Sequence, residues 1–147
     1  MSADIWKELQ SGRVPEPWTF GPLTVTDFVR YQGASGDMNP VHHDEAFAKG
    51  AGFPGPLAVG MFAAGAMNSY ATRWLGAENV RGTRVRWRKP AFAGYEMTVS
   101  AEVSKTWEEG EERRAELALS VVDSEGELSL QGWMIFVVPE RRGESHE

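Results

Sequence analysis

The sequence contains no cysteine among its 147 residues. This absence excludes a thiol nucleophile, a disulfide framework, a thiolate-bound zinc ion and a cysteine-held iron–sulfur cluster. It is typical of a protein that works in a reducing compartment. The first residues, MSADIWKELQSGR, also lack the basic start and continuous apolar stretch of a secretion signal. We therefore expect a cytoplasmic protein whose chemistry depends on other side chains.

An excess of basic charge and a long apolar run are missing as well. The formal net charge is −6, and nucleic-acid affinity comes mostly from basic residues that neutralise phosphates. The most apolar run, LAVGMFAAGAM at residues 57–67, is well short of the ~20 residues that span a bilayer. We therefore expect neither a nucleic-acid partner nor a membrane partner.

The length of the chain suits a single domain, because a domain of this size buries roughly 68–70% of its unfolded surface. We expect that domain to cover residues 1–147. Pro15 and Pro17 predict an irregular lead-in over residues 1–17, and Pro139 predicts a loose polar tail over residues 140–147.

Capping and periodicity predict helices in the first half of the chain and strands in the second. Thr24 and Asp27 have capping-box spacing before a helix that stops near Gly33 or Gly36. The other predicted helices cover residues 44–48 and 57–75, and the predicted strands cover residues 19–23, 81–89, 95–107, 112–123 and 127–138. Short connections make neighbouring strands antiparallel, so the fold class is α+β, with a sheet curled around the long helix.

Two groups of larger side chains have two readings each. Arg84, Arg86 and Arg88 alternate along a predicted strand and share one face, which is either a solvated surface or a contact for a ligand phosphate. Four tryptophans either belong to the core, which is the more common case, or line a pocket for an acyl group: Trp74, Trp87, Trp107 and Trp133.

The stretch GDMNPVHHDEAF, residues 36–47, holds two of the three histidines. The preceding GASGD, residues 33–37, has Asp where a nucleophile elbow G-x-S-x-G has its last Gly, and it follows a helix instead of a strand. A metal site is disfavoured because adjacent histidines seldom face one ion and no third histidine lies in ordered sequence. A polar turn shaped by Asp37, Asn39 and Pro40 remains a simple alternative.

Acid–base catalysis needs two groups of different pKa that face one small space. Asp37 and His42 qualify, because Pro40 fixes φ and biases Asn39 to an extended conformation, so that side chains five residues apart can converge. The turn into the long helix offers backbone N–H groups for a developing negative charge, and Gly60 permits close approach there.

The stretch GDMNPVHHDEAFA resembles the signature of the MaoC-like hydratases, also known as R-specific enoyl-CoA hydratases and related 3-hydroxyacyl dehydratases. The similarity extends from the helix at Thr24 through GAGFPGPLAVGMF to the strand that ends near Pro90, roughly two thirds of the chain. The resemblance implies a hot-dog fold, in which the sheet wraps the long helix, in dimers with acyl tunnels near the subunit interface.

The resemblance also implies roles for individual residues. Asp37 and His42 would hold and polarise the catalytic water, the backbone N–H of Gly60 would bind the thioester oxygen, and Asn39 would support the loop. The implied reaction interconverts trans-2-enoyl and 3-hydroxyacyl thioesters of coenzyme A or an acyl carrier protein. It needs no metal or redox cofactor. The arginine face is a candidate contact for the carrier's phosphates.

Two positions depart from the family pattern. Relatives commonly have His before the glycine of the long-helix turn, as in AHGML, whereas this chain has Val59 in AVGMF. Asn68 stands where relatives often have a serine that assists the histidine, and an amide can still form a hydrogen bond there. Residue 43 varies in the family, so we expect His43 to be a surface residue.

Three functions remain open from the sequence. The first is an enoyl thioester hydratase or dehydratase, as a homodimer or a hetero-oligomer with another hot-dog subunit. The second, favoured by Val59 and Asn68, is a non-catalytic subunit that binds acyl thioesters. The third is a hot-dog thioesterase, which has no need for the Asp-Asn-Pro-His arrangement.

Overall fold

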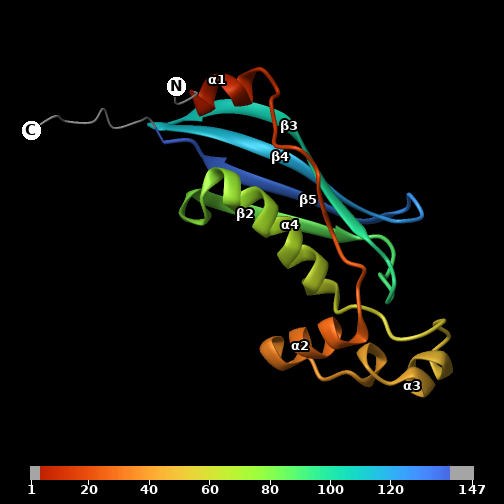
Figure 1. The fold of residues 1–147 in the computed structure, drawn as a ribbon. Coiled ribbons are helices and arrows are strands. Elements are labelled where there is room, and N and C mark those ends of the chain that lie inside the picture. Colours follow the sequence, from red (N-terminus) through yellow and green to blue (C-terminus); the bar gives the residue numbers. More distant parts are fainter. Residues whose placement is uncertain (1–3, 140–147) are drawn as a thin grey trace, which may run out of the picture.

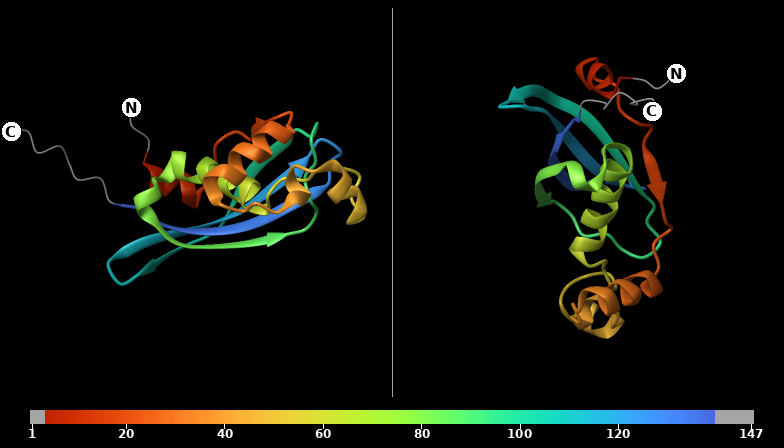
Figure 2. Two further views of the ribbon diagram at one scale, coloured as in Figure 1. Left: turned by 90° about the horizontal axis from the view of Figure 1, so that it is seen from below. Right: turned by 90° about the vertical axis from the view of Figure 1, so that its left-hand side faces the viewer.

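The computed structural model of the protein describes residues 4–139, so the tail predicted for residues 140–147 lies outside the described part. A long helix, α4, lies along one face of a curved five-stranded sheet (Figures 1 and 2). The strand order is β1-β3-β4-β5-β2, and every pair is antiparallel. The strands are β1 (Trp18–Phe20), β2 (Val80–Trp87), β3 (Met97–Glu109), β4 (Glu112–Asp123) and β5 (Leu128–Val137). This is the predicted α+β arrangement, the hot-dog fold.

The helices follow the capping signals closely. Thr24 and Asp27 form a complete capping box at the start of α2 (Val25–Ser35), and Asp44 caps α3 (Glu45–Gly50) by accepting a hydrogen bond from the Phe47 N–H. The remaining helices are α1 (Ile5–Gln10), α4 (Gly60–Leu75) and the 3-10 turns η1 (Pro40–His42) and η2 (Ala77–Asn79). Helices α2 and α3 lie together beyond the N-terminal end of α4 (Figure 1).

The core lies between α4 and the concave face of the sheet. Small residues such as Ala64 and Ala71 let the helix approach closely, and Met67 between them is fully buried. Opposite Met67, β5 carries Gly132, where a Cβ atom would overlap the Sδ and Cε atoms of Met67. The strands contribute the other half of this core through alternating side chains, including those of β4: Ala115, Leu117, Leu119 and Val121.

Two segments differ from their predicted structure. Residues 5–10 form helix α1 instead of an irregular lead-in, because Asp4 caps the Trp6 N–H and Leu9 is buried against the sheet. The long helix begins at Gly60, three residues later than predicted, because Leu57 and Ala58 are extended and pair with the segment after β2. The periodicity of an apolar run does not reveal such a pairing.

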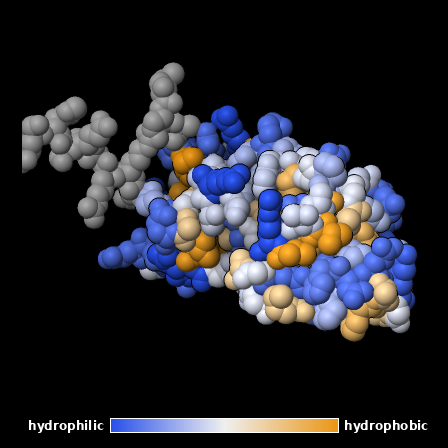
Figure 3. Space-filling view, turned by 60° about the horizontal axis from the view of Figure 1, so that its bottom comes forward, coloured by the Kyte–Doolittle hydropathy of each residue, from blue (hydrophilic) through white to orange (hydrophobic). Residues whose placement is uncertain are grey.

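On the face shown in Figure 3, hydrophobic residues form small patches among hydrophilic ones. Within residues 4–139, no helix has the length and hydrophobicity needed to cross a membrane.

Met67 provides a test of how the helix packs on the sheet. Met67→Ala should lower the free energy of unfolding by about 2–5 kcal/mol, because the buried side chain leaves a cavity over Gly132, whereas Met67→Leu should cost less than about 1.5 kcal/mol. Urea denaturation followed by circular dichroism measures both. A loss below about 1 kcal/mol in the alanine variant would show that this contact is not part of a tightly packed core.

The capping box makes stability depend on pH. Hydrogen bonds from the Thr24 hydroxyl and the Thr24 backbone N–H hold the pKa of Asp27 below its ordinary value of 3.8. A depressed pKa in the folded state gives stability that is present above the unfolded pKa and is lost as pH falls through the folded value. The difference in unfolding free energy between wild type and Asp27→Asn should therefore be largest above about pH 5 and shrink towards about pH 3. A difference that stays constant over this range would contradict the assignment.

Candidate active site

The loop between α2 and α3 changes direction twice within seven residues. Helix α2 ends at Gly36, whose φ of 77° lies in the left-handed region that glycine adopts without strain. The Asn39 side chain then accepts a hydrogen bond from the Val41 N–H and so caps η1, with Pro40 as the first residue of that turn. Asn39 therefore supports the loop, as expected, and the loop returns the chain so that residues 37 and 42 face each other.

Asp37 and His42 come together as the sequence predicted. His42 Nε2 lies 3.7 Å from Asp37 Oδ2. The other ring nitrogen, Nδ1, lies 2.7 Å from the carbonyl oxygen of Leu57. A carbonyl only accepts, so Nδ1 carries a proton, and the neutral tautomer with this proton presents an Nε2 lone pair to the carboxylate. Two acceptors at this separation do not bond each other directly, but a water molecule can donate one hydrogen to each.

The two side chains differ in their surroundings. His42 is buried, with 8% of its surface exposed, whereas 46% of the Asp37 side chain is exposed. The Asp37 Oδ1 atom accepts a hydrogen bond from the Asn39 N–H at 3.2 Å, which orients the carboxylate and leaves Oδ2 for the imidazole side. The imidazole is therefore fixed from the interior, and the carboxylate meets solvent.

Gln32 is a residue of this site that the sequence did not reveal. Its side chain is 1% exposed and projects from α2 under the loop. The Nε2 group donates to the carbonyl oxygens of Asp37 at 2.8 Å and of Asn39 at 3.1 Å, and Oε1 accepts from His43 Nδ1 at 2.9 Å. A buried glutamine on the apolar side of a helix was the available signal, but its partners depend on how the loop returns.

A cavity of about 290 Å³ opens beside His42. Gly60 and His42 line it, whereas Asp37 lies outside the lining and faces His42 Nε2 at 3.7 Å. Val59, the N-cap of α4, provides no side-chain hydrogen bond to the first turn. Its carbonyl oxygen accepts from the Phe62 N–H, so the Gly60 N–H is the one that can face a ligand. The other lining residues come from the segments on either side: Leu57, Ala58, Ala63, Trp87, Arg88, Lys89, Pro90, Ala91 and Ser129.

Trp87 does not lie in the core, although burial in the core was expected for most of the tryptophans. Half of its surface is exposed, and its indole Nε1–H donates to the carbonyl oxygen of Gly60 at 2.9 Å. Because strand β2 is at the edge of the sheet, the Trp87 side chain at its end contacts the N-terminal end of α4 and also meets solvent.

The predicted substrate contacts are distributed unevenly around the cavity. Arg88 lines it and donates to Gln131 Oε1 at 3.0 Å. Arg84 lies over the Trp133 ring, 4.6 Å from its centroid, and Arg86 is exposed on the same outer face. Neither Arg84 nor Arg86 lines the cavity.

Asn68 lies two turns into α4 and is not part of the cavity wall. Its buried Oδ1 atom has no hydrogen-bond partner among residues 4–139. An unpaired buried acceptor is costly, so this position is suited to a donor from another molecule. His43 is exposed, as expected, although its ring is held by Gln32.

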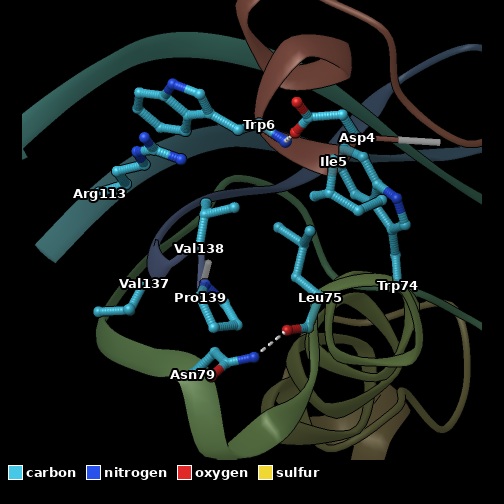
Figure 4. A pocket seen from close by; sticks show the side chains of 10 residues that line it. All are labelled: Asp4, Ile5, Trp6, Trp74, Leu75, Asn79, Arg113, Val137, Val138 and Pro139. Atoms are coloured by element: carbon cyan, nitrogen blue, oxygen red, sulfur yellow. Dashed lines mark hydrogen bonds between the residues drawn. The ribbon is translucent and has the colours of Figure 1, made fainter. Parts of the chain in front are cut away.

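A larger cavity, of about 560 Å³, lies at the opposite end of α4 and is lined by Trp6, Trp74 and Arg113 among others (Figure 4). It contains no histidine, and its one carboxylate, Asp4, caps helix α1. The smaller cavity, in contrast, has the Asp–His pair beside it. Within the described part of the chain, no cluster of three or more His, Cys, Asp or Glu side chains could hold a metal ion.

The curved antiparallel sheet packed on one long helix is the fold of a hot-dog protein. The sequence model of the MaoC like domain family matches residues 9–124, and the chain belongs to this family. No curated protein matches the sequence significantly.

Solved structures support the same fold. An (R)-hydratase from A. caviae involved in PHA biosynthesis is 25% identical, with a TM-score of 0.75 over 88% of this chain and 99% of that one. The unliganded R-hydratase PhaJ1 from Pseudomonas aeruginosa is 24% identical, with a TM-score of 0.73 over 90% and 86%. A chain of the ChsH1-ChsH2 complex from Mycobacterium tuberculosis is 20% identical, with a TM-score of 0.76 over 87% and 97%.

Gln32→Leu should lower the free energy of unfolding by about 1–3 kcal/mol, because a side chain of similar size would leave the Asp37 and Asn39 carbonyls without their donor. The matched control is Gln10→Leu at the exposed end of α1, which should stay within about 0.5 kcal/mol of wild type. Urea denaturation of both variants compares them. Equal effects would mean that the buried amide does not hold the loop.

Proposed function

We propose that the protein is a hydratase or dehydratase that interconverts trans-2-enoyl and 3-hydroxyacyl thioesters. The observation that carries this proposal is the 3.7 Å approach of His42 Nε2 and Asp37 Oδ2 at a cavity lined by the first turn of α4. Membership of the MaoC-like family and similarity to two R-hydratases support the same reaction class.

The pair acts as the acid–base catalyst. In hydration, a water molecule that donates to both side chains loses one proton to the pair while its oxygen bonds to C3 of the enoyl thioester. The pair then returns one proton to C2 and regains its starting state. Dehydration reverses these steps. The hydrogen bond to the Leu57 carbonyl keeps Nε2 directed at this water.

The first turn of α4 stabilises the charge that moves to the thioester oxygen. The Gly60 N–H stands at the positive end of a 16-residue helix, and the N-cap Val59 does not compete for it with a side chain. Oriented amide donors at such an oxygen are worth about 2.7–4 kcal/mol of barrier. Because Gly60 has no side chain, the Trp87 indole can pack against the backbone beside this N–H.

Cationic residues at the cavity suit a phosphate-bearing carrier such as coenzyme A or an acyl carrier protein. The Glu127 carboxylate, which bonds Lys89 Nζ, raises the pKa of Lys89 and offsets much of its charge. Arg88 bonds the neutral amide of Gln131 and keeps its full charge at the cavity. We assign the carrier contact to Arg88 in particular, with Arg84 and Arg86 further along the same face.

The functional unit is an oligomer in this proposal, either a homodimer or a pair with another hot-dog subunit. Strand β2 has a hydrogen-bonded neighbour on one side only in the described residues, β5, so its other edge is available to a second chain. Hot-dog chains of similar fold occur in the ChsH1-ChsH2 and HadBC complexes from Mycobacterium tuberculosis.

A second candidate is a non-catalytic subunit that binds acyl thioesters and completes the site of a partner. The unpaired Asn68 Oδ1 favours this function, because a donor from a partner chain would satisfy it. Val59, where relatives commonly have histidine, removes one polar group from the cavity.

Asp37→Asn and His42→Ala should each lower kcat for hydration of crotonyl-CoA about 10²- to 10⁴-fold, because each removes one of the two groups that position and deprotonate water. Loss of the enoyl thioester absorbance measures the rate, and a thiol reagent reports any released coenzyme A. The matched control is Asp44→Asn, since asparagine still caps α3 and this side chain bonds the Phe47 N–H outside the cavity.

The three possible functions give different results in this assay. Absorbance loss without thiol release supports the hydratase, and thiol release would identify a thioesterase. Absence of both in the wild type, over a range of chain lengths and carriers, would contradict catalysis and support the binding subunit. Full activity in Asp37→Asn would contradict the assigned pair.

A further inference from the structure

The Trp87 indole packs directly against the backbone of Gly60. The indole Nε1–H donates to the Gly60 carbonyl at 2.9 Å. A Cβ atom at residue 60 would lie 2.9 Å from Trp87 Nε1 and 3.3 Å from its Cδ1. The ring therefore occupies the space in which any other side chain at residue 60 would begin.

This contact lies at the wall of the candidate active site. Trp87, Gly60 and His42 line the same cavity of about 290 Å³. Much of the remaining wall consists of small residues such as Ala58 and Ala63, so the indole is the largest side chain that bounds the space. Trp87 is half exposed and stands at the end of the edge strand β2, so its ring forms the outer part of this wall.

We propose that Trp87 determines the size of the acyl group that the cavity admits and also positions the first turn of α4. This inference rests on the proposed function, in which the cavity binds an acyl thioester. The two roles come from different parts of the side chain. The ring supplies the wall, and the indole N–H fixes the peptide unit that follows the Gly60 amide.

Two substitutions at Trp87 distinguish the role of the ring as a wall from the role of its N–H as a donor. Trp87→Phe keeps an aromatic ring as a wall and removes the N–H donor. It should lower kcat for all chain lengths about 2- to 10-fold and leave the preference between them within about 2-fold. Trp87→Ala also removes the wall. It should raise the ratio of kcat/KM for trans-2-decenoyl-CoA over crotonyl-CoA by about 10-fold or more, since each methylene in an apolar pocket changes discrimination by about 10- to 200-fold.

Gly60→Ala gives an independent test of the contact. Its Cβ should displace the indole, so this variant should also shift the preference towards the longer substrate. The matched control for ring removal is Trp107→Ala, because Trp107 lies near the β3–β4 turn, where it bonds Glu109. This control should leave the ratio of kcat/KM unchanged. Circular dichroism of each variant confirms that it is folded.

A binding measurement separates failure of this inference from failure of the proposed function. Titration calorimetry with butyryl-CoA and decanoyl-CoA, which cannot be hydrated, compares wild type with Trp87→Ala. If the wild type has no hydratase activity but the alanine variant shifts binding towards decanoyl-CoA by about 10-fold, the proposed function fails and the inference holds. An active wild type whose preference is unchanged in Trp87→Ala overturns the inference alone. A wild type that binds neither thioester overturns both.

Discussion

The hydrogen bond from His42 Nδ1 to the carbonyl oxygen of Leu57 is the constraint on which the candidate site depends. It fixes the tautomer and the direction of Nε2, which then faces Asp37. The Leu57 carbonyl is itself held in place, because the Leu57 N–H bonds the Val41 carbonyl and the next residue, Ala58, bonds the Ala91 carbonyl. The imidazole is thereby tied to the segment that follows the edge strand β2 rather than to a free loop.

Three parts of the chain meet at the cavity beside His42, and each provides a different chemical group. The loop after α2 supplies two titratable groups, the first turn of α4 supplies amide donors, and the end of β2 supplies Trp87 and Arg88 as walls. Gln32 holds the loop from below by satisfying two backbone carbonyls. Backbone carbonyl groups therefore accept the hydrogen bonds that hold both the loop and the imidazole.

Local signals in the sequence predicted most of the fold and the central pair. The capping residues Thr24 and Asp44 set helix starts correctly, and the Asn-Pro kink placed Asp37 near His42. The resemblance to the MaoC-like family, confirmed by the family match, added the hot-dog arrangement. Short connections between alternating strands were sufficient to predict antiparallel pairing.

What the sequence did not predict depends on contacts between distant segments. The role of Gln32 requires the loop after α2 to bring its carbonyl groups back to the Gln32 side chain. The position of Trp87 requires the edge strand β2 to lie beside Gly60. The extended conformation of Leu57 and Ala58 arises from pairing with residues 91 and 92, more than thirty positions away. Helix α1 was not predicted, because Pro15 and Pro17 indicate irregular structure and a six-residue helix has little periodicity of its own.

The most direct test of the central claim is isotope incorporation from water labelled with oxygen-18 during incubation with crotonyl-CoA. If Asp37 and His42 share one water molecule that adds to the substrate, mass spectrometry will find the label in the hydroxyl group at C3 of an intact thioester. Asp37→Asn and His42→Ala will incorporate it about 10²- to 10⁴-fold more slowly than the wild type. Label found only in a released carboxylic acid, or in no product of the wild-type protein, would contradict the account.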